Sequence, residues 1–254
     1  MNLFVHRAKT AATIARDLAA LRRDDVWLAT FPKTGSSWVR SVVSELAHGD
    51  AASLSEIDRA LPALGAGTLG EPWGGEDVPR LVKTHHAYRP LLFARPGRTL
   101  LLVRDPRDTL SSYHHMLSKR RVARFDGSLS DLARHPRFGI GAYLRHYASW
   151  APRATAVLRY EALRADPVAA FGDAFRALGV DVAPDRLAGA VERSSLSRMR
   201  AREVREGIAN DDRFDDDFAF VRQGAERAEA ERFSADDEAL YQRLRARAGF
   251  DLYP

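Results

Sequence analysis

The sequence has no cysteine among its 254 residues. This absence excludes disulfide bonds and thiolate zinc sites, and it fits a reducing compartment, so we expect a cytoplasmic protein. No apolar run approaches the roughly 20 residues that a membrane-spanning helix needs, so we expect no membrane span. Lysine is scarce as well. The 39 basic side chains include only four lysines, Lys9, Lys33, Lys83 and Lys119, and two of these fall in the motifs described below.

The composition allows a substantial core, because 45% of the residues are hydrophobic. No internal repeat, low-complexity tract or linker is present, which predicts a single domain over residues 1–254. Residues 1–24 form one apolar helical face without the continuous apolar core of a secretory signal, which favours a helix packed on the domain. The net charge of +5 suits an arginine-rich surface or an anionic ligand. Because the basic residues are spread along the chain, we expect no nucleic acid.

A strand, a tight loop and a helix follow one another at residues 26–46. The apolar and β-branched run 26–31 predicts a buried strand that Pro32 ends, and Gly35 supplies a turn. Ser36 and Ser37 occupy the position of a helix N-cap, before apolar residues at helical spacing. Free N–H groups and the helix dipole at such a junction favour an anion. An ordinary strand–turn–helix junction is the alternative interpretation.

The lysine of this loop precedes the only glycine, so the loop is not a Walker A motif, in which the lysine follows the second glycine. The segment P-K-T-G-S-S-W resembles the 5′-phosphosulfate loop of the cytosolic sulfotransferases, which use 3′-phosphoadenosine 5′-phosphosulfate (PAPS) and release its desulfated product PAP. The resemblance implies that this loop binds the cofactor. The implied residues are Lys33, Thr34, Gly35, Ser36, Ser37 and Trp38, with Lys33 also acting in catalysis and Trp38 as the main surface that stacks on adenine.

A histidine follows the next predicted strand, residues 80–83. In open α/β sheets ligands bind beyond the carboxyl ends of the strands, so His85 should face the same crevice as Lys33. A lone histidine often has only a structural role. Here the segment K-T-H resembles the sulfotransferase segment whose histidine is the catalytic base, which selects His85 over its neighbour His86. Lys83 is predicted to assist electrostatically.

The clearest buried strand, residues 98–103, is apolar throughout, as central parallel strands are. It leads into R-D-P-R-D, in which Asp105 suits a helix cap and Pro106 the first turn. With Ser112 two turns later, this segment resembles the 3′-phosphate motif of the same family. The resemblance implies that Arg104 and Ser112 hold the 3′-phosphate. The alternative for Arg104 is a capping salt bridge with Asp108.

Three weaker resemblances extend the match as far as residue 224. The predicted strand 155–160 is followed by a Tyr-Glu-x-Leu-x-x-x-Pro pattern that resembles the family segment whose tyrosine contacts adenine, although by chemistry alone Tyr160 is an ordinary strand-end aromatic. The segment S-S-L-S-R-M resembles an adenosine contact with serine and leucine replacing threonine and phenylalanine. The segment V-R-Q-G resembles a 3′-phosphate clamp with glutamine replacing lysine, and the residues that normally follow it differ. The implied cofactor-binding residues are Tyr160, Ser194, Leu196, Arg222, Gln223 and Gly224.

No metal site is expected. His114 and His115 are adjacent on a predicted helix and do not converge. The acidic run 211–217 lacks calcium-loop spacing and favours a solvated loop. The C-terminal segment 225–254 contains a predicted last helix that starts near Ser234 and ends at Gly249.

Strands interleaved with helices predict one α/β domain with a central parallel sheet flanked by helices. The resemblance implies the P-loop-kinase-like sulfotransferase fold and sulfuryl transfer to a hydroxyl or amine of a small-molecule, lipid or glycan acceptor, without a metal. The pocket for the acceptor is expected to be formed by residues 47–78, 119–150 and 205–220. Two alternatives remain: a small-metabolite kinase with Asp105 as a magnesium ligand, and a nucleotide-binding protein without catalysis. The oligomeric state is not predicted.

Overall fold

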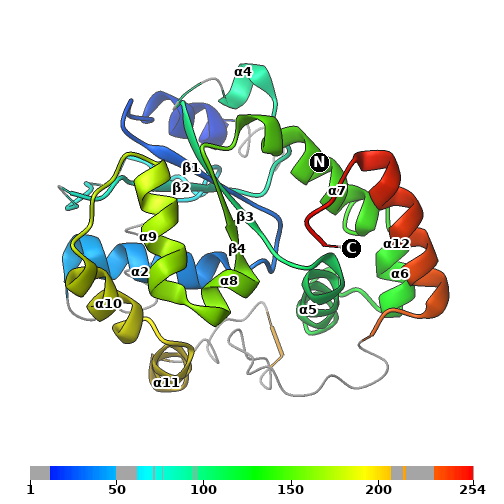
Figure 1. Ribbon diagram of the computed structural model, residues 1–254. Coiled ribbons are helices and arrows are strands. Elements are labelled where there is room, and N and C mark those ends of the chain that lie inside the picture. The colour runs from blue at the N-terminus through cyan, green and yellow to red at the C-terminus, as the bar shows by residue number, and fades with distance from the viewer. Residues whose placement is uncertain are drawn as a thin grey trace.

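The protein is built on one four-stranded parallel sheet, drawn in Figure 1. The computed structural model describes residues 12–49, 62–70, 72–75, 77–93, 95, 97–206, 214–215 and 232–253. Within these residues the sheet has the order β2-β1-β3-β4, and every neighbouring pair is parallel. The predicted α/β class with a central parallel sheet is confirmed. The strands are β1 (Val26–Thr30), β2 (Leu81–Thr84), β3 (Arg98–Val103) and β4 (Ala156–Arg159).

The observed strands lie close to their predicted positions. The strand predicted at residues 98–103 is found with those bounds, and the other three differ by one residue at one or both ends. One of these differences matters for the site: Tyr160 does not end β4 but begins the next helix, α8 (Tyr160–Ala165).

Both faces of the sheet are buried at β1 and β3, where successive residues of a strand belong to different cores, whereas the edge strand β4 exposes Val157 on one face. In β1, Val26 and Leu28 pack in one core, whereas Trp27 and Ala29 pack in the other. Figure 1 shows a group of helices on each side of the sheet. The first group comprises α2 (Ser36–His48), α9 (Pro167–Ala177), α10 (Pro184–Arg193) and α11 (Leu196–Glu206). The second comprises α5 (Pro106–Ser118), α6 (Leu129–Arg134), α7 (Ile140–Trp150) and α12 (Ala235–Ala248), while the short α4 (Pro90–Phe93) lies apart from both groups in the view.

Helix ends follow the capping signals of the sequence at most positions. Asp105 caps α5 by accepting a hydrogen bond from the Arg107 N–H, and a capping box at Ser234 opens α12. Gly249, with φ 60°, ends α12 in the left-handed conformation, as predicted. The prediction was wrong at α2, whose N-cap is Gly35 and not one of the following serines. The backbone has φ 103° at that residue, a conformation that favours glycine over serine.

A buried ion pair joins β1 and β2 at their amino ends. Arg80 donates from Nε and from a terminal nitrogen to the two carboxylate oxygens of Asp25, at 2.8 and 2.7 Å. Both side chains are almost fully buried, at 2% and 0% exposure. This bidentate pair fixes the alignment of the two strands, in which Ala29 lies opposite Thr84. The first residues after these two strands therefore lie side by side at the other end of the sheet.

The extent of the domain stays a prediction at both ends. Residues 12–19 are helical, within the predicted N-terminal helix 1–24, and α12 lies within the predicted C-terminal segment 225–254. The structure describes neither segment completely. No helix in the described parts of the chain is both long and apolar enough to cross a membrane.

Candidate functional site

Each of the four strands ends next to a residue that the sequence analysis selected. The Lys33 loop follows β1, His85 follows β2, Arg104 follows β3 and Tyr160 follows β4. The chain leaves β1 toward α2 on one face of the sheet and leaves β3 toward α5 on the other face. Such a divergence between neighbouring parallel strands opens a crevice at their carboxyl ends. The predicted site residues thus come together at this one edge.

The loop after β1 is folded by its own hydroxyl groups. Thr34 is fully buried, and its Oγ1 donates to the carbonyl oxygen of Phe31 at 2.9 Å and pairs with the hydroxyl of Thr30. This side chain therefore holds the loop against β1 instead of pointing into the crevice. Lys33 has φ 72°, a conformation that is uncommon for a non-glycine residue. Because the first N–H groups of α2 have no intrahelical partner, the backbone at Ser36 and Ser37 offers donors for an anion.

Tyr160 packs directly against this loop. A Cβ atom added to Gly35 would lie 2.6 Å from Cδ2 of the Tyr160 ring, so the glycine is required for this approach as well as for its φ angle. The ring also lies edge-on to Trp38, with centroids 6.2 Å apart. The guanidinium of Arg104 lies over the Tyr160 ring, 4.5 Å from its centroid. Tyr160 thus connects the predicted 5′ and 3′ parts of the cofactor site.

Arg104 also contacts the loop and its own helix. One terminal nitrogen donates to the carbonyl oxygen of Lys33 at 3.4 Å, and the other forms an ion pair with Asp108 at 3.3 Å. The capping salt bridge considered as an alternative role is therefore present in this structure. Asp108 is one helical turn from Arg104, and Ser112 is one turn further along the same face of α5. An anion bound on this face would meet both Arg104 and Ser112.

His85 forms a short hydrogen bond at the carboxyl ends of β1 and β2. Its Nδ1 lies 2.7 Å from the carbonyl oxygen of Thr30, the last residue of β1. A carbonyl oxygen only accepts hydrogen bonds, so Nδ1 carries the proton and Nε2 of the neutral ring keeps its lone pair. The described hydrogen bonds of the neighbouring His86 come from its backbone: its N–H donates to Thr84 and its carbonyl accepts from Trp150.

The surroundings of His85 favour the neutral ring. Its pKa is lowered from 6.5 to about 4, first by desolvation among the surrounding protein atoms and next by the positive charge of Lys83. The residue is nevertheless exposed. Both observations fit a ring at the edge of an open crevice, surrounded by protein and accessible on one side. At neutral pH the geometry and the charge therefore leave Nε2 able to accept a proton.

A second histidine beside this site was missed by the sequence analysis. His146, on α7, is 4% exposed, and its Nε2 is buried without a hydrogen-bond partner among the described residues. Its ring lies edge-on to Phe31, with centroids 6.0 Å apart. Burial, and to a smaller extent the charges of His85 and His86, lower its pKa from 6.5 to about 3. The available signal for this residue was its helical spacing, three residues after the apolar Tyr143.

The remaining predicted residues are buried, are partly buried against a core, or lie outside the described residues. Ser194 caps α10 and is fully buried, and its Oγ has no hydrogen-bond partner in the described part of the chain. Leu196, the first residue of α11, packs against the core that contains Trp38. Trp38 is 7% exposed, so its ring belongs to this core and offers little surface for stacking, whereas its buried Nε1 has no described partner. The clamp residues Arg222, Gln223 and Gly224 lie outside the described residues.

No group of acidic or histidine side chains among the described residues could hold a metal ion. Nε2 of His114 donates to the carbonyl oxygen of Gly127, 2.8 Å away. Of the acidic run, Asp215 is described, and it forms an ion pair with Arg124 at 2.7 Å.

Comparison with known proteins assigns the family. The model of the sulfotransferase domain matches residues 71–243 of the chain. The chain belongs to the sulfotransferase family. The matched segment contains His85, Arg104 and Tyr160, while the Lys33 loop precedes it. Two similar proteins are mouse sulfotransferase 4A1, 29% identical over 191 residues, and human sulfotransferase 6B1, 32% identical over 106 residues. The match to the mouse protein covers 68% of this chain and 66% of the mouse protein, so the chain spans slightly less than two thirds of that relative. The match to the human protein covers 40% of this chain and 35% of the human protein.

Solved structures give the same fold. A mouse sulfotransferase, SULT7A1, complexed with PAP superposes with a TM-score of 0.68 at 18% identity, over 96% of this sulfotransferase and 91% of that chain. Retinol dehydratase in a complex with retinol and PAP gives a TM-score of 0.67 at 16% identity, over 92% and 84%. At these identities the likeness establishes the fold, which is the predicted sulfotransferase fold.

Proposed function

We propose that this sulfotransferase moves the sulfuryl group of PAPS to a hydroxyl or amine of a small-molecule, lipid or glycan acceptor. The observation that carries the proposal is the placement of His85, the Lys33 loop and Arg104 beyond the ends of three neighbouring strands. Such a placement provides a base, an anion-binding loop and a second cation within one crevice. The family and the PAP complexes of structures with the same fold support the choice of cofactor.

In this proposal the two anionic groups of PAPS bind at different strand ends. The 5′-phosphosulfate binds to the N–H groups at the start of α2, with Lys33 and the hydroxyls of Ser36 and Ser37. The 3′-phosphate binds to Arg104 and Ser112, and the clamp predicted at residues 222–224 completes this part. Thr34 acts through the backbone, because its hydroxyl is engaged within the loop. Tyr160 and Leu196 form the nucleoside side of the site, while the buried Trp38 supports it by packing edge-on to Tyr160 and the buried Ser194 lies two residues before Leu196.

The transfer step uses the histidine as a general base. The acceptor oxygen or nitrogen forms a bond to sulfur, while the bond between sulfur and the bridging oxygen of the 5′-phosphate breaks. The acceptor proton passes to Nε2 of His85, and the electrons of the broken bond stay on PAP. Lys33 and the N–H groups of the loop stabilise the negative charge that develops on the bridging oxygen. A sulfuryl group carries less negative charge than a phosphoryl group, so this chemistry needs no magnesium ion.

The acceptor is proposed at the level of chemical class. Structures with this fold have been solved with retinol and with androsterone, which are small apolar alcohols. Near His85, the rings of Phe31 and His146 pack on each other and are buried, and we expect such largely apolar surroundings to suit an apolar acceptor that carries one polar group. A cytoplasmic location is also part of this proposal and rests on the resemblance to cytosolic sulfotransferases.

The kinase alternative depends on Asp105, and the contacts of this carboxylate do not favour it. One oxygen accepts from the Arg107 N–H at 2.7 Å, and the other accepts from the Arg107 guanidinium at 3.2 Å. Asp105 therefore caps α5 and is paired with a cation, which is a structural role.

The test is incubation of the full chain with sulfur-35 PAPS and a panel of phenols, sterols, lipids and glycans. We expect a labelled product whose mass exceeds that of the acceptor by one SO₃ group, together with stoichiometric PAP. The His85→Asn variant provides the matched control, and we expect it to bind PAP without forming product. PAP binding without transfer of label to any acceptor in the panel or in a cell extract would contradict the proposal, as would a labelled product that His85→Asn forms as fast as the parent protein.

A further inference from the structure

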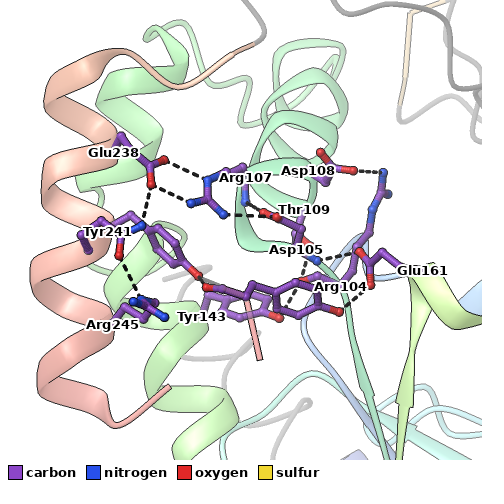
Figure 2. Close-up of polar contacts among 12 residues, drawn as sticks. Arg104, Asp105, Arg107, Asp108, Thr109, Tyr143, Glu161, Glu238, Tyr241 and Arg245 are labelled. Carbon is purple, nitrogen blue, oxygen red and sulfur yellow. Dashed lines mark hydrogen bonds and ion pairs between the residues drawn. The ribbon is translucent and has the colours of Figure 1, made fainter. Parts of the chain in front are cut away.

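A network of hydrogen bonds joins the C-terminal end of the chain to the turn that carries Arg104 (Figure 2). After α12 the chain continues to Tyr253, which is 4% exposed. The hydroxyl of Tyr253 donates to one carboxylate oxygen of Glu161 at 2.5 Å, and its carbonyl oxygen accepts from the hydroxyl of Tyr241 at 2.5 Å. The end of the chain is therefore held at both its backbone and its side chain.

Glu161 links Tyr253 to the residues that follow β3. Its other carboxylate oxygen accepts from the N–H of Asp105 at 3.0 Å. On the opposite side of the same peptide group, the carbonyl oxygen of Arg104 accepts from the hydroxyl of Tyr143 at 2.7 Å. The peptide group that links Arg104 to Asp105 is therefore hydrogen-bonded at both its N–H and its carbonyl oxygen. Because its orientation fixes the backbone angles on both sides, it determines where the Arg104 side chain starts.

A second connection joins α12 to the first turn of α5. Arg107 forms a bidentate pair with Glu238 of α12, at 2.8 and 2.6 Å, and its guanidinium lies over the Tyr241 ring, 4.5 Å from the centroid. The same arginine also bonds Asp105. Figure 2 shows both connections meeting at residues 104–107. Bidentate pairs of this kind add directional constraint as well as energy.

We propose that Tyr253 is a positioning residue for the 3′-phosphate of the cofactor. Through Glu161 it holds the peptide group behind Arg104, so that the guanidinium is already oriented when the anion arrives. Glu161 is also the neighbour of Tyr160, whose ring lies under the Arg104 guanidinium. The inference rests on the proposed function, because it assumes that Arg104 binds the 3′-phosphate.

The test replaces the Tyr253 hydroxyl with hydrogen and measures nucleotide binding by calorimetry. In Tyr253→Phe the ring is kept, and we expect the dissociation constant for PAP to rise about three- to tenfold, as loss of one buried hydrogen bond predicts. Binding of adenosine 5′-monophosphate, which lacks the 3′-phosphate, should change less than twofold. Tyr147→Phe is the matched control. Its ring packs on Phe250 of the same segment, and its hydroxyl has no described bond to the network.

A double variant separates positioning from a general loss of structure. In an Arg104→Ala background, Tyr253→Phe should cause no further loss of PAP affinity, because its effect passes through Arg104. If Tyr253→Phe fails to fold, Glu161→Asp provides the same test, since the shorter side chain keeps the charge but cannot reach both partners. Equal weakening of both nucleotides, unchanged PAP binding, or an additive loss in the double variant would each overturn the positioning role. A parent protein that does not bind PAP would instead overturn the proposed function.

Discussion

The Nδ1 atom of His85 lies 2.7 Å from the carbonyl oxygen of Thr30. This contact joins the residue after β2 to the last residue of β1, so the sheet itself orients the imidazole. The carbonyl requires a proton on Nδ1 and leaves Nε2 as the basic nitrogen. The proposed base is therefore set by backbone geometry, and its partner cannot be removed by a side-chain substitution.

Replacing His85 should remove turnover and leave cofactor binding intact. In His85→Asn the amide nitrogen can still donate to the Thr30 carbonyl, but no group remains at the position of Nε2. We expect turnover to fall by about 10² or more, as loss of a general base does. PAP affinity measured by calorimetry should stay within about twofold, since the proposed cofactor contacts lie at other strand ends.

His86→Asn is the control for this prediction, because the described hydrogen bonds of His86 are made by its backbone. We expect the control to retain at least half of the parent turnover. A His85→Asn variant with nearly normal turnover, or a loss of equal size in His86→Asn, would contradict the assignment of the base.

Replacing Arg104 should affect one nucleotide much more than another. In Arg104→Ala the dissociation constant for PAP should rise about 10- to 100-fold, the usual effect of losing a hydrogen bond to a charged group. Adenosine 5′-monophosphate should bind almost as before, because it lacks the phosphate that Arg104 is proposed to hold. Arg176→Ala removes the same charge from an exposed position on α9 and should leave both affinities unchanged. Equal losses for PAP and the monophosphate would show that Arg104 does not contact the 3′-phosphate.

The sequence predicted the features of the site that depend on local order. The strand at residues 98–103, the cap at Asp105 and the stop at Gly249 follow from apolar pattern and capping chemistry, and the structure has all three. The position of His85 beyond a strand end followed from the general rule for open parallel sheets. These residues are determined by their immediate neighbours in the chain.

The parts of the site that sequence reasoning missed depend on contacts between distant segments. The approach of Tyr160 to Gly35 arises when the residue after β4 and the loop after β1 are brought together by the sheet, and the apolar pattern gave no signal for the left-handed conformation of Lys33 in that loop. Tyr253 is 92 residues away from Glu161, and no spacing rule predicts such a bond. Trp38 was predicted to stack on adenine from its place in the loop, but tertiary packing buries it in the core.

Replacing Gly35 with alanine should destabilise the protein through two separate effects. The φ angle of 103° is strained for any residue with a Cβ, at about 1–2 kcal/mol. The added Cβ would also lie 2.6 Å from Tyr160 Cδ2, and such overpacking costs typically about 1–3 kcal/mol more. Urea unfolding followed by tryptophan fluorescence measures the sum.

Gly249→Ala separates the two effects. Gly249 is in the left-handed conformation, as Gly35 is, and a Cβ there would meet nothing within 4 Å. This control should therefore lose only the backbone contribution, and Tyr160→Ala combined with Gly35→Ala should restore part of the difference. If Gly35→Ala is no less stable than Gly249→Ala, the close packing of Tyr160 on the loop is not a constraint.

The buried His146 predicts a specific dependence of stability on pH. Its pKa in the folded protein is about 3, below the value of 6.5 in an unfolded chain. Between pH 6.5 and pH 3 the unfolded state therefore binds a proton at His146 that the folded state does not bind. As the pH falls through this range the residue lowers the free energy of unfolding, and above this range it has no such effect. The slope for one proton is about 1.4 kcal/mol per pH unit.

In His146→Gln the loss of stability between pH 6 and pH 4 should be shallower by up to this amount, whatever the stability of the variant at pH 8. Urea unfolding at a series of pH values measures both slopes. Parallel curves for the variant and the parent would mean that His146 takes up its proton in the folded protein as readily as in the unfolded chain.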